Sequence, residues 1–128
     1  MEYNFEEYKS PGGRILPRIT LGKSGGINIS AGFAKKYDIR NVVGARVFFD
    51  KEKMAIGIVL VKEKVDGMLN IKLAPKQGGG YINTRGFLIK YDIDAERWSN
   101  RYEPKEVDIP NGEKMFVIEL QDNLRKDN

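Results

Sequence analysis

The side chains in this sequence best suited to chemistry are positively charged, and they gather in its first half. Residues 14–76 carry 13 basic and 5 acidic side chains, a net charge of +8, whereas residues 1–13 and 77–128 each carry a net charge of −2. Such an asymmetry favours an anionic partner for the basic half. Lysine and arginine at turns and helix ends reach phosphates without being buried, and phosphate contacts supply much of the affinity for nucleic acids.

Eight basic residues stand where such contacts are expected. They flank the first predicted strand, lie on the first hairpin turn, on or just past the first helix, at the start of the next strand and at the start of the second helix. Each one alone could equally be a solvated surface residue, so the prediction depends on the cluster. These candidate nucleic-acid-binding residues are Arg14, Arg18, Lys23, Lys35, Lys36, Arg40, Arg46 and Arg85.

Residue types suited to catalysis or metal binding are scarce. The chain has no cysteine and no histidine, which removes thiolate chemistry and the most usual general base and metal ligand. Gly22-Lys-Ser24 matches the end of a phosphate-binding loop, but Pro17 stands where that motif needs glycine, and a turn is predicted where it needs a helix. Carboxylates such as Glu52 and Asp94 fall at predicted turns and helix ends. We therefore predict no enzyme, no catalytic residue, no metal site and no cofactor.

The composition is that of one small globular domain. Of the 128 residues, 41% are hydrophobic and 31% charged, which is an ordinary balance for a folded protein with a single core. The longest apolar run, 54–61, has strand length and is far shorter than the roughly 20 residues of a membrane-spanning helix. The acidic N-terminus lacks the basic and then apolar pattern of a secretion signal. We expect a cytoplasmic protein with no membrane contact.

The sequence contains an internal repeat. Residues 25–39 align with residues 79–93 at an offset of 54, and eight of the fifteen positions are identical. A repeat of this kind indicates two copies of one supersecondary unit. We predict an N-terminal arm at 1–13, a single domain at 14–120 made of repeat 1 (14–66) and repeat 2 (67–120), and a polar tail at 121–128.

One unit is predicted to run strand, strand, helix, strand, strand. Alternating apolar residues mark strands at 18–22 and 26–30 with a glycine-containing turn between them. Ser30 stands at the N-cap of a helix from Ala31 to Tyr37, and a hairpin spans 46–61. The helical pairs Phe33/Tyr37 and Phe87/Tyr91 are expected to face the core.

The second unit is predicted to follow the same order. Thr84 is expected to cap its helix, Tyr81 aligns with Ile27 and is expected in the core, and its last strand covers 114–120. The segment 94–110, which contains Trp98, has no counterpart in the first unit. The predicted fold class is therefore mostly β with short helices, a pseudo-twofold small β-barrel made of two tandem β-β-α-β-β units.

Four segments of the first unit carry a family resemblance: the strand-turn-strand Ile19–Ser30, the helix end Tyr37-Asp-Ile39, the Gly-x-x-Val step Gly44–Val47 and the acidic turn Asp50–Lys53. Their order resembles that of the AbrB/SpoVT/MazE-like swapped-hairpin family. Two copies in one chain are similar to the MraZ branch of that family or to the double-psi barrel. The resemblance implies a DNA-binding transcription regulator that forms a homodimer or a higher oligomer.

We therefore expect a non-enzymatic protein that binds duplex DNA, chiefly through the basic hairpin and helix-end residues of the first repeat, with the second repeat as its structural partner. Two alternatives remain open. One is a protein that binds single-stranded nucleic acid by stacking bases on Tyr81, Trp98 or phenylalanine rings. The other is a protein-interaction module that docks on a larger complex through Trp98 and the acidic arms.

Overall fold

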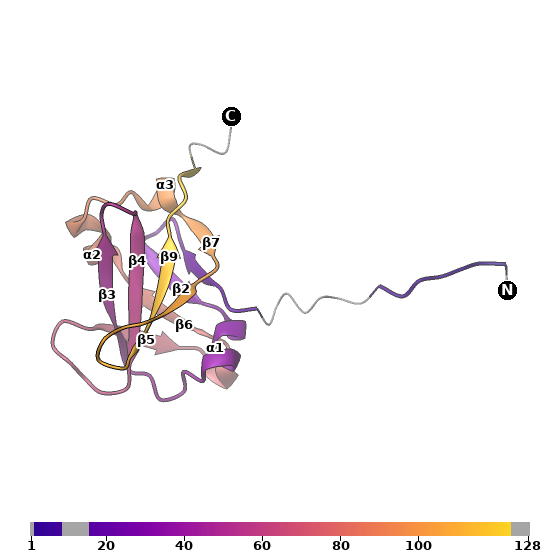
Figure 1. Cartoon of the computed structure of the whole chain (residues 1–128), viewed down its shortest axis with the longest axis horizontal. Coiled ribbons are helices and arrows are strands. Elements are labelled where there is room, and N and C mark those ends of the chain that lie inside the picture. Colours follow the sequence, from indigo (N-terminus) through magenta and orange to yellow (C-terminus); the bar gives the residue numbers. More distant parts are fainter. Residues whose placement is uncertain (1, 9–15, 124–128) are drawn as a thin grey trace.

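The computed structural model describes residues 2–8 and 16–123. Its described elements are mostly strands, with a few short helices (Figure 1). In chain order they are β1 (Ile19–Leu21), β2 (Gly26–Ile29), α1 (Ala31–Tyr37), β3 (Gly44–Asp50), β4 (Ala55–Val61), β5 (Leu69–Leu73), the 3-10 turn η2 (Pro75–Gln77), β6 (Gly80–Asn83), α2 (Arg85–Lys90), α3 (Ala95–Trp98), β7 (Asn100–Tyr102), β8 (Lys105–Asp108) and β9 (Lys114–Glu119). The prediction of a mostly β fold with short helices is confirmed. Over the described residues, no helix is long and apolar enough to cross a membrane.

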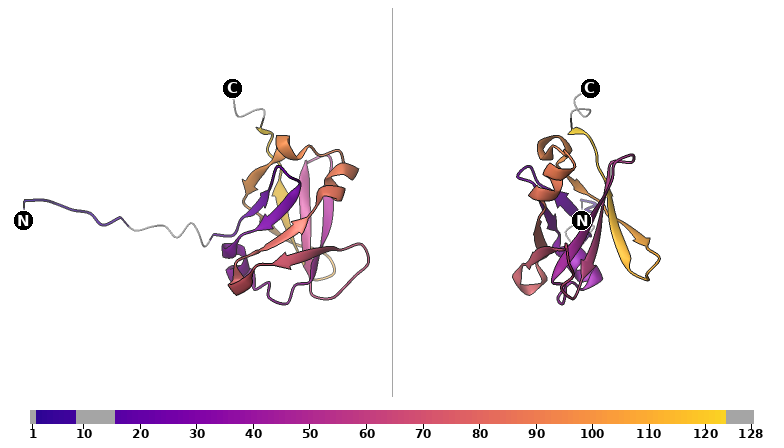
Figure 2. Two further views of the ribbon diagram at one scale, coloured as in Figure 1. Left: turned by 180° about the vertical axis from the view of Figure 1, so that it is seen from behind. Right: turned by 90° about the vertical axis from the view of Figure 1, so that its left-hand side faces the viewer.

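The strands form one curled antiparallel sheet in the order β7-β1-β2-β6-β5-β3-β4-β9-β8. The two views in Figure 2 show the sheet bent over itself, with the helices at its margins. Segment 94–110 contributes α3 and the two outermost strands. Because only Glu103 and Pro104 separate β7 from β8, the chain itself links the two ends of the sheet.

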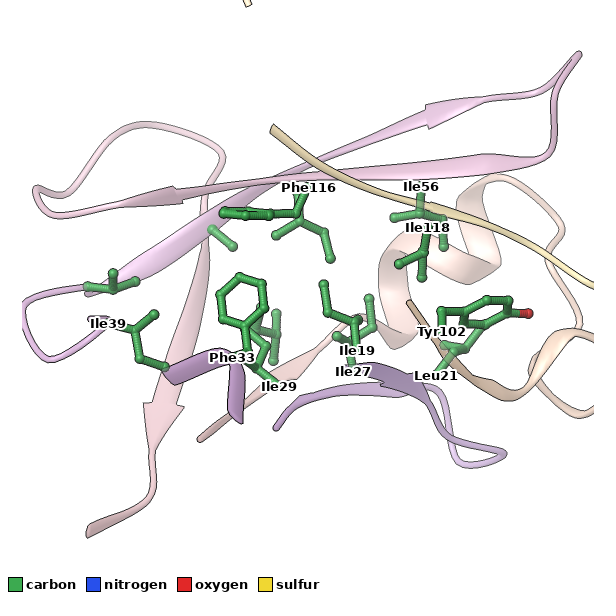
Figure 3. Packing of buried hydrophobic residues seen from close by; sticks show 14 of the residues in the cluster. Ile19, Leu21, Ile27, Ile29, Phe33, Ile39, Ile56, Tyr102, Phe116 and Ile118 are labelled. Atoms are coloured by element: carbon green, nitrogen blue, oxygen red, sulfur yellow. The ribbon is translucent and has the colours of Figure 1, made fainter. Parts of the chain in front are cut away.

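The core fills the inside of this curl. Figure 3 shows Ile56, Phe116 and Ile118, from β4 and β9, facing a second layer from β1, β2 and α1. The isoleucines at the centre, such as Ile19 and Ile27, are fully buried. Burying one such side chain stabilises the fold by about 1.5–3 kcal/mol. The single core therefore draws on both repeats.

The two repeats meet where β2 pairs with β6. Ile27 lies opposite Ile82 and Asn28 lies opposite Tyr81. Ile27 and Ile82 are both fully buried, so Ile82, and not Tyr81 as the 54-residue offset predicts, occupies the place equivalent to Ile27. The first repeat has Gly26 directly before Ile27, whereas the second has Tyr81 as an additional residue between Gly80 and Ile82. Successive side chains in a strand point to opposite faces, so Tyr81 faces away from the core when Ile82 faces into it. The prediction of a core position for Tyr81 is therefore wrong, because its side chain points outward.

The two helices begin differently. The backbone N–H of Phe33 donates to Ser30 Oγ at 3.1 Å, which confirms Ser30 as the N-cap of α1. Thr84 makes no such bond at the start of α2. Its hydroxyl is fully buried and instead donates to the carbonyl of Gly25 at 2.6 Å, which satisfies a backbone oxygen of the other repeat. Thr84 therefore links the two repeats by a buried hydrogen bond and does not cap α2 as predicted.

Each of these helices places its aromatic pair on a phenylalanine of the other repeat. Phe33 and Tyr37 each lie with their ring centroids 4.7 Å from that of Phe116 on β9. Phe87 and Tyr91 contact Phe49 on β3 in the same way, at 6.4 and 5.2 Å. The second triplet is less enclosed, because Phe87 is half-buried and Tyr91 is 42% exposed.

The two triplets should therefore differ in their contribution to stability. Replacing the buried Phe33 with alanine should lower the free energy of unfolding by about 3–5 kcal/mol, the usual cost of deleting a core phenyl ring. Phe87→Ala should cost clearly less, because that ring is already partly in water. Chemical denaturation followed by circular dichroism measures both changes. Equal destabilisation by the two variants would contradict the difference in burial.

Candidate nucleic-acid interface

The five strands of the half-sheet β7-β1-β2-β6-β5 contain no carboxylate. None of these five strands includes an aspartate or glutamate, whereas β3, β8 and β9 all do. Seen from behind, in the left view of Figure 2, β1, β2, β5 and β6 lie in front and the helices stand at their margins. The inward side chains of these strands fill the core. The side chains at the alternate positions point away from the core, where a ligand can reach them.

Strand register places five polar side chains in one row across this face. Lys72 lies opposite Tyr81, Tyr81 opposite Asn28, Asn28 opposite Thr20, and Thr20 opposite Arg101. Thr20 is half-buried and the other four are exposed. Adjacent strands lie about 4.8 Å apart, so the row spans roughly 20 Å. We call these five residues the outer row, which carries a cation at each end and an aromatic ring between them.

The ring of Tyr81 is supported by a glycine. A Cβ atom built on Gly26 of β2 would collide with the Cε1, Cζ and hydroxyl atoms of Tyr81. The tyrosine therefore leans across β2, over a position that only glycine leaves open, as aromatic rings do over strand glycines elsewhere. Its side chain remains 36% exposed. The ring is thus held against the sheet and still accessible from outside.

A hollow of about 290 Å³ lies beside this ring. Tyr81, Asn28 and Lys72 contribute to its wall, together with the turn between β5 and β6. That turn is closed by a hydrogen bond from Ala74 N to Gly79 O at 2.9 Å. Gly79, at φ +103°, approaches the carbonyl of Ile29 so closely that no side chain would fit. The hollow is therefore bounded on one side by a turn fixed against β2.

Of the eight residues predicted from the sequence, Lys23 and Arg85 come together at one margin of this face. Lys23 is exposed on the turn between β1 and β2. Arg85, the first residue of α2, donates from Nε to the carbonyl of Ser24 on that turn at 3.4 Å. The buried Thr84–Gly25 hydrogen bond holds the same two segments together. Cations from both repeats therefore share one margin.

The other predicted residues lie elsewhere. Lys35 and Lys36 are exposed on the last turn of α1. Arg18 is half-buried and donates from Nη1 to the carbonyl of Pro17 at 2.8 Å. It lines a polar hollow of about 380 Å³ together with Arg101, Lys105 and the carboxylates of Glu103 and Glu119. Arg14 lies outside the described residues.

Two of the predicted cations are already paired. Arg46 lies 3.3 Å from a carboxylate oxygen of Glu113 and over the ring of Phe48. Arg40 donates from Nε and Nη2 to the two carboxylate oxygens of Asp38, at 2.7 and 2.8 Å. These hydrogen bonds lower the pKa of Asp38 from 3.8 to about 2. A carboxylate therefore already neutralises the charge of each arginine, and each is less available to bind an anion than its position in the sequence predicts.

Sequence reasoning missed three residues of the outer row, namely Lys72, Asn28 and Thr20. It predicted little contribution from Arg101, because acidic residues such as Glu103 lie close to it in the sequence. The three missed residues are the polar members of alternating strands, which marks them as outward-facing. Their alignment depends on pairing between strands far apart in the chain, which no local pattern reveals. Arg101 lies in segment 94–110, where the sequence pattern predicts no strand. Tyr81 is a candidate for base stacking from the sequence, but its alignment with Ile27 favours the core.

No group of three or more metal-binding side chains occurs in the part of the chain that the structure describes. Comparison of the chain with models of known protein families, with curated proteins and with solved structures finds no match. The assignment of a function therefore depends on the geometry of the outer face.

The Asp38–Arg40 pair should be visible in a pH titration. Because the pKa of Asp38 is lower in the folded chain than in the unfolded chain, the pair contributes stability above about pH 4, and this contribution is lost as the pH falls through about 2. Replacing Arg40 with glutamine should return the pKa of Asp38 toward 3.8. NMR titration of the Asp38 carboxyl carbon measures this pKa in the unmutated protein and in the variant. A value near 3.8 in the unmutated protein would mean that Arg40 is unpaired in solution.

Proposed function

We propose that this protein binds nucleic acid, DNA in particular, through the outer row and the Lys23–Arg85 margin. The observation that carries the proposal is a set of five neighbouring strands without a carboxylate, whose outward row of polar side chains has a cation at each end. A polyanion approaching this face meets attraction along its length and no opposing charge on the strands. We propose a binding role and not a catalytic one.

The residue types along the face suit this role. Lysine and arginine bind phosphate oxygens, and the side chains of asparagine, threonine and tyrosine add hydrogen bonds to phosphate, sugar or base. Lys72 and Arg101 form no ion pair within the part of the chain that is described. Their charge can therefore be neutralised by phosphate without first breaking an internal pair.

We further propose that the fold is a pseudo-twofold barrel of the swapped-hairpin or double-psi kind. If β7 and β8 are taken as one bent strand, the sheet order becomes a closed circle. The counterparts are β1 and β5, β2 and β6, β3 and the bent strand β7–β8, and β4 and β9. Exchanging each strand with its counterpart leaves the order round that circle unchanged. This symmetry supports the resemblance to the swapped-hairpin regulators, and from that resemblance we propose a role in transcription regulation and a homodimeric or higher assembly.

The protein-docking alternative has less support. Trp98, its expected anchor, is half-buried and packs against the core, and Arg97 lies 5.0 Å from the centre of its ring. An interface hot spot is typically an aromatic side chain available to a partner's pocket. The geometry of Trp98 is that of a structural residue, so we favour the nucleic-acid proposal.

Charge removal should separate the outer row from the rest of the surface. The variant Lys72→Gln/Arg101→Gln should weaken binding to duplex and single-stranded DNA of any sequence. It should also reduce the slope of log affinity against log salt by about 0.9 for each duplex phosphate that the variant no longer neutralises. Fluorescence anisotropy at about 50 and 200 mM salt measures both effects.

The matched control is Arg46→Gln/Lys114→Gln. It removes the same charge from β3 and β9, where Arg46 pairs with Glu113 and Lys114 with Glu106. The control should bind DNA almost as the unmutated protein does. An equal drop in affinity in the two variants would contradict the proposed face, and no binding by the unmutated protein at low salt would exclude nucleic-acid binding.

A further inference from the structure

We infer that the hollow beside Tyr81 receives one unpaired base of a single-stranded nucleic acid, with the base stacked on the tyrosine ring. This inference rests on the proposed function and names the form of nucleic acid that the face selects. Its starting observation is that an exposed aromatic ring, an amide side chain and a lysine lie around one hollow.

The ring is prepared for stacking before any ligand arrives. Tyr81 leans over Gly26, and its position is limited on that side by the backbone of β2. An aromatic side chain already held in its binding orientation loses little rotamer freedom when a base stacks on it. Because every base has a π-face, such a platform accepts different sequences.

The two neighbours of Tyr81 in the outer row supply the polar interactions. Asn28, on β2, offers an amide that can donate to and accept from a base edge. Lys72, on β5, lies on the other side of the ring and can reach the phosphate of the same nucleotide. Both residues line the hollow, and among the described residues no carboxylate does.

This arrangement selects an unpaired base. In a duplex each base is stacked on both faces, so none can reach a ring on the surface of a sheet without being flipped out, which costs a few kcal/mol. A single strand presents its bases freely, and sheet faces with exposed aromatic rings are a recurrent means of binding it. Lys72 would then bind the phosphate of the stacked nucleotide, and Arg101, three strand spacings or about 14 Å from Tyr81 along the outer row, a phosphate further along the strand.

The inference is tested with a short deoxythymidine oligonucleotide and a duplex of equal length. Tyr81→Ala should weaken binding of the oligonucleotide by about 5- to 150-fold, the range for removing one base–aromatic stack, and change duplex binding less than twofold. Tyr81→Phe should bind as the unmutated protein does, because it keeps the ring. The control Tyr8→Ala removes a tyrosine that is 83% exposed on the N-terminal arm and should have no effect.

Two further measurements test the position of the ring. Gly26→Ala keeps the ring but displaces it, so this variant should also bind the oligonucleotide more weakly. In the unmutated protein, the ring protons of Tyr81 should shift upfield in NMR spectra when the oligonucleotide is added.

Two outcomes would overturn the inference and leave the proposed function in place. They are unchanged oligonucleotide affinity in Tyr81→Ala, or an equal drop in affinity for both probes. If the unmutated protein binds neither probe, the proposed function fails as well.

Discussion

The antiparallel pairing of β2 with β6 joins the two repeats and decides which side chains face the core and which face outward. With Ile27 opposite Ile82, both isoleucines are buried, and Asn28 and Tyr81 are placed side by side on the surface. A shift of β6 by one residue would turn Tyr81 inward and expose Ile82, at a cost of about 1.5–3 kcal/mol for that side chain alone. The candidate interface is thus the outer side of the pairing that builds the core.

Charge is arranged differently on the two halves of the curled sheet. On β3, β8 and β9 the cations have carboxylate partners, as Arg46 has Glu113 and Lys105 has Glu119. Such exposed pairs add little to stability, but they leave that surface close to neutral. The five strands that carry the outer row contain no carboxylate, although Glu103 and Glu119 line the hollow at the Arg101 end of the row. The strands of one half-sheet therefore carry only positive charge, and those of the other half carry both signs.

Local features of the fold can be predicted from the sequence, and features that depend on distant pairing cannot. Helix α1, its Ser30 cap and its inward Phe33 follow from residue types within ten positions of one another. The outward position of Tyr81 cannot be predicted in this way. The helices of the two repeats align at an offset of 54 residues, but the strands β2 and β6 align at an offset of 55, with Ile82 equivalent to Ile27. Arg40 and Arg46 are surface cations, as their positions in the sequence predict, but their partners Asp38 and Glu113 reduce their value as ligands for phosphate. The outer row becomes visible only once strands from both repeats are aligned.

The place of β1 in the sheet has a consequence for how the chain folds. One neighbour of β1 is β2, which is a few residues away in the chain. The other is β7, so Ile19 can pair with Tyr102 only after the intervening chain has been made. Likewise α1 packs on Phe116 of β9, near the end of the domain. Folds dominated by such long-range pairings fold in milliseconds to seconds, more slowly than helical bundles of similar size. While the protein is being synthesised, its first hairpin must remain without its partners from the second repeat until nearly the whole domain has left the ribosome.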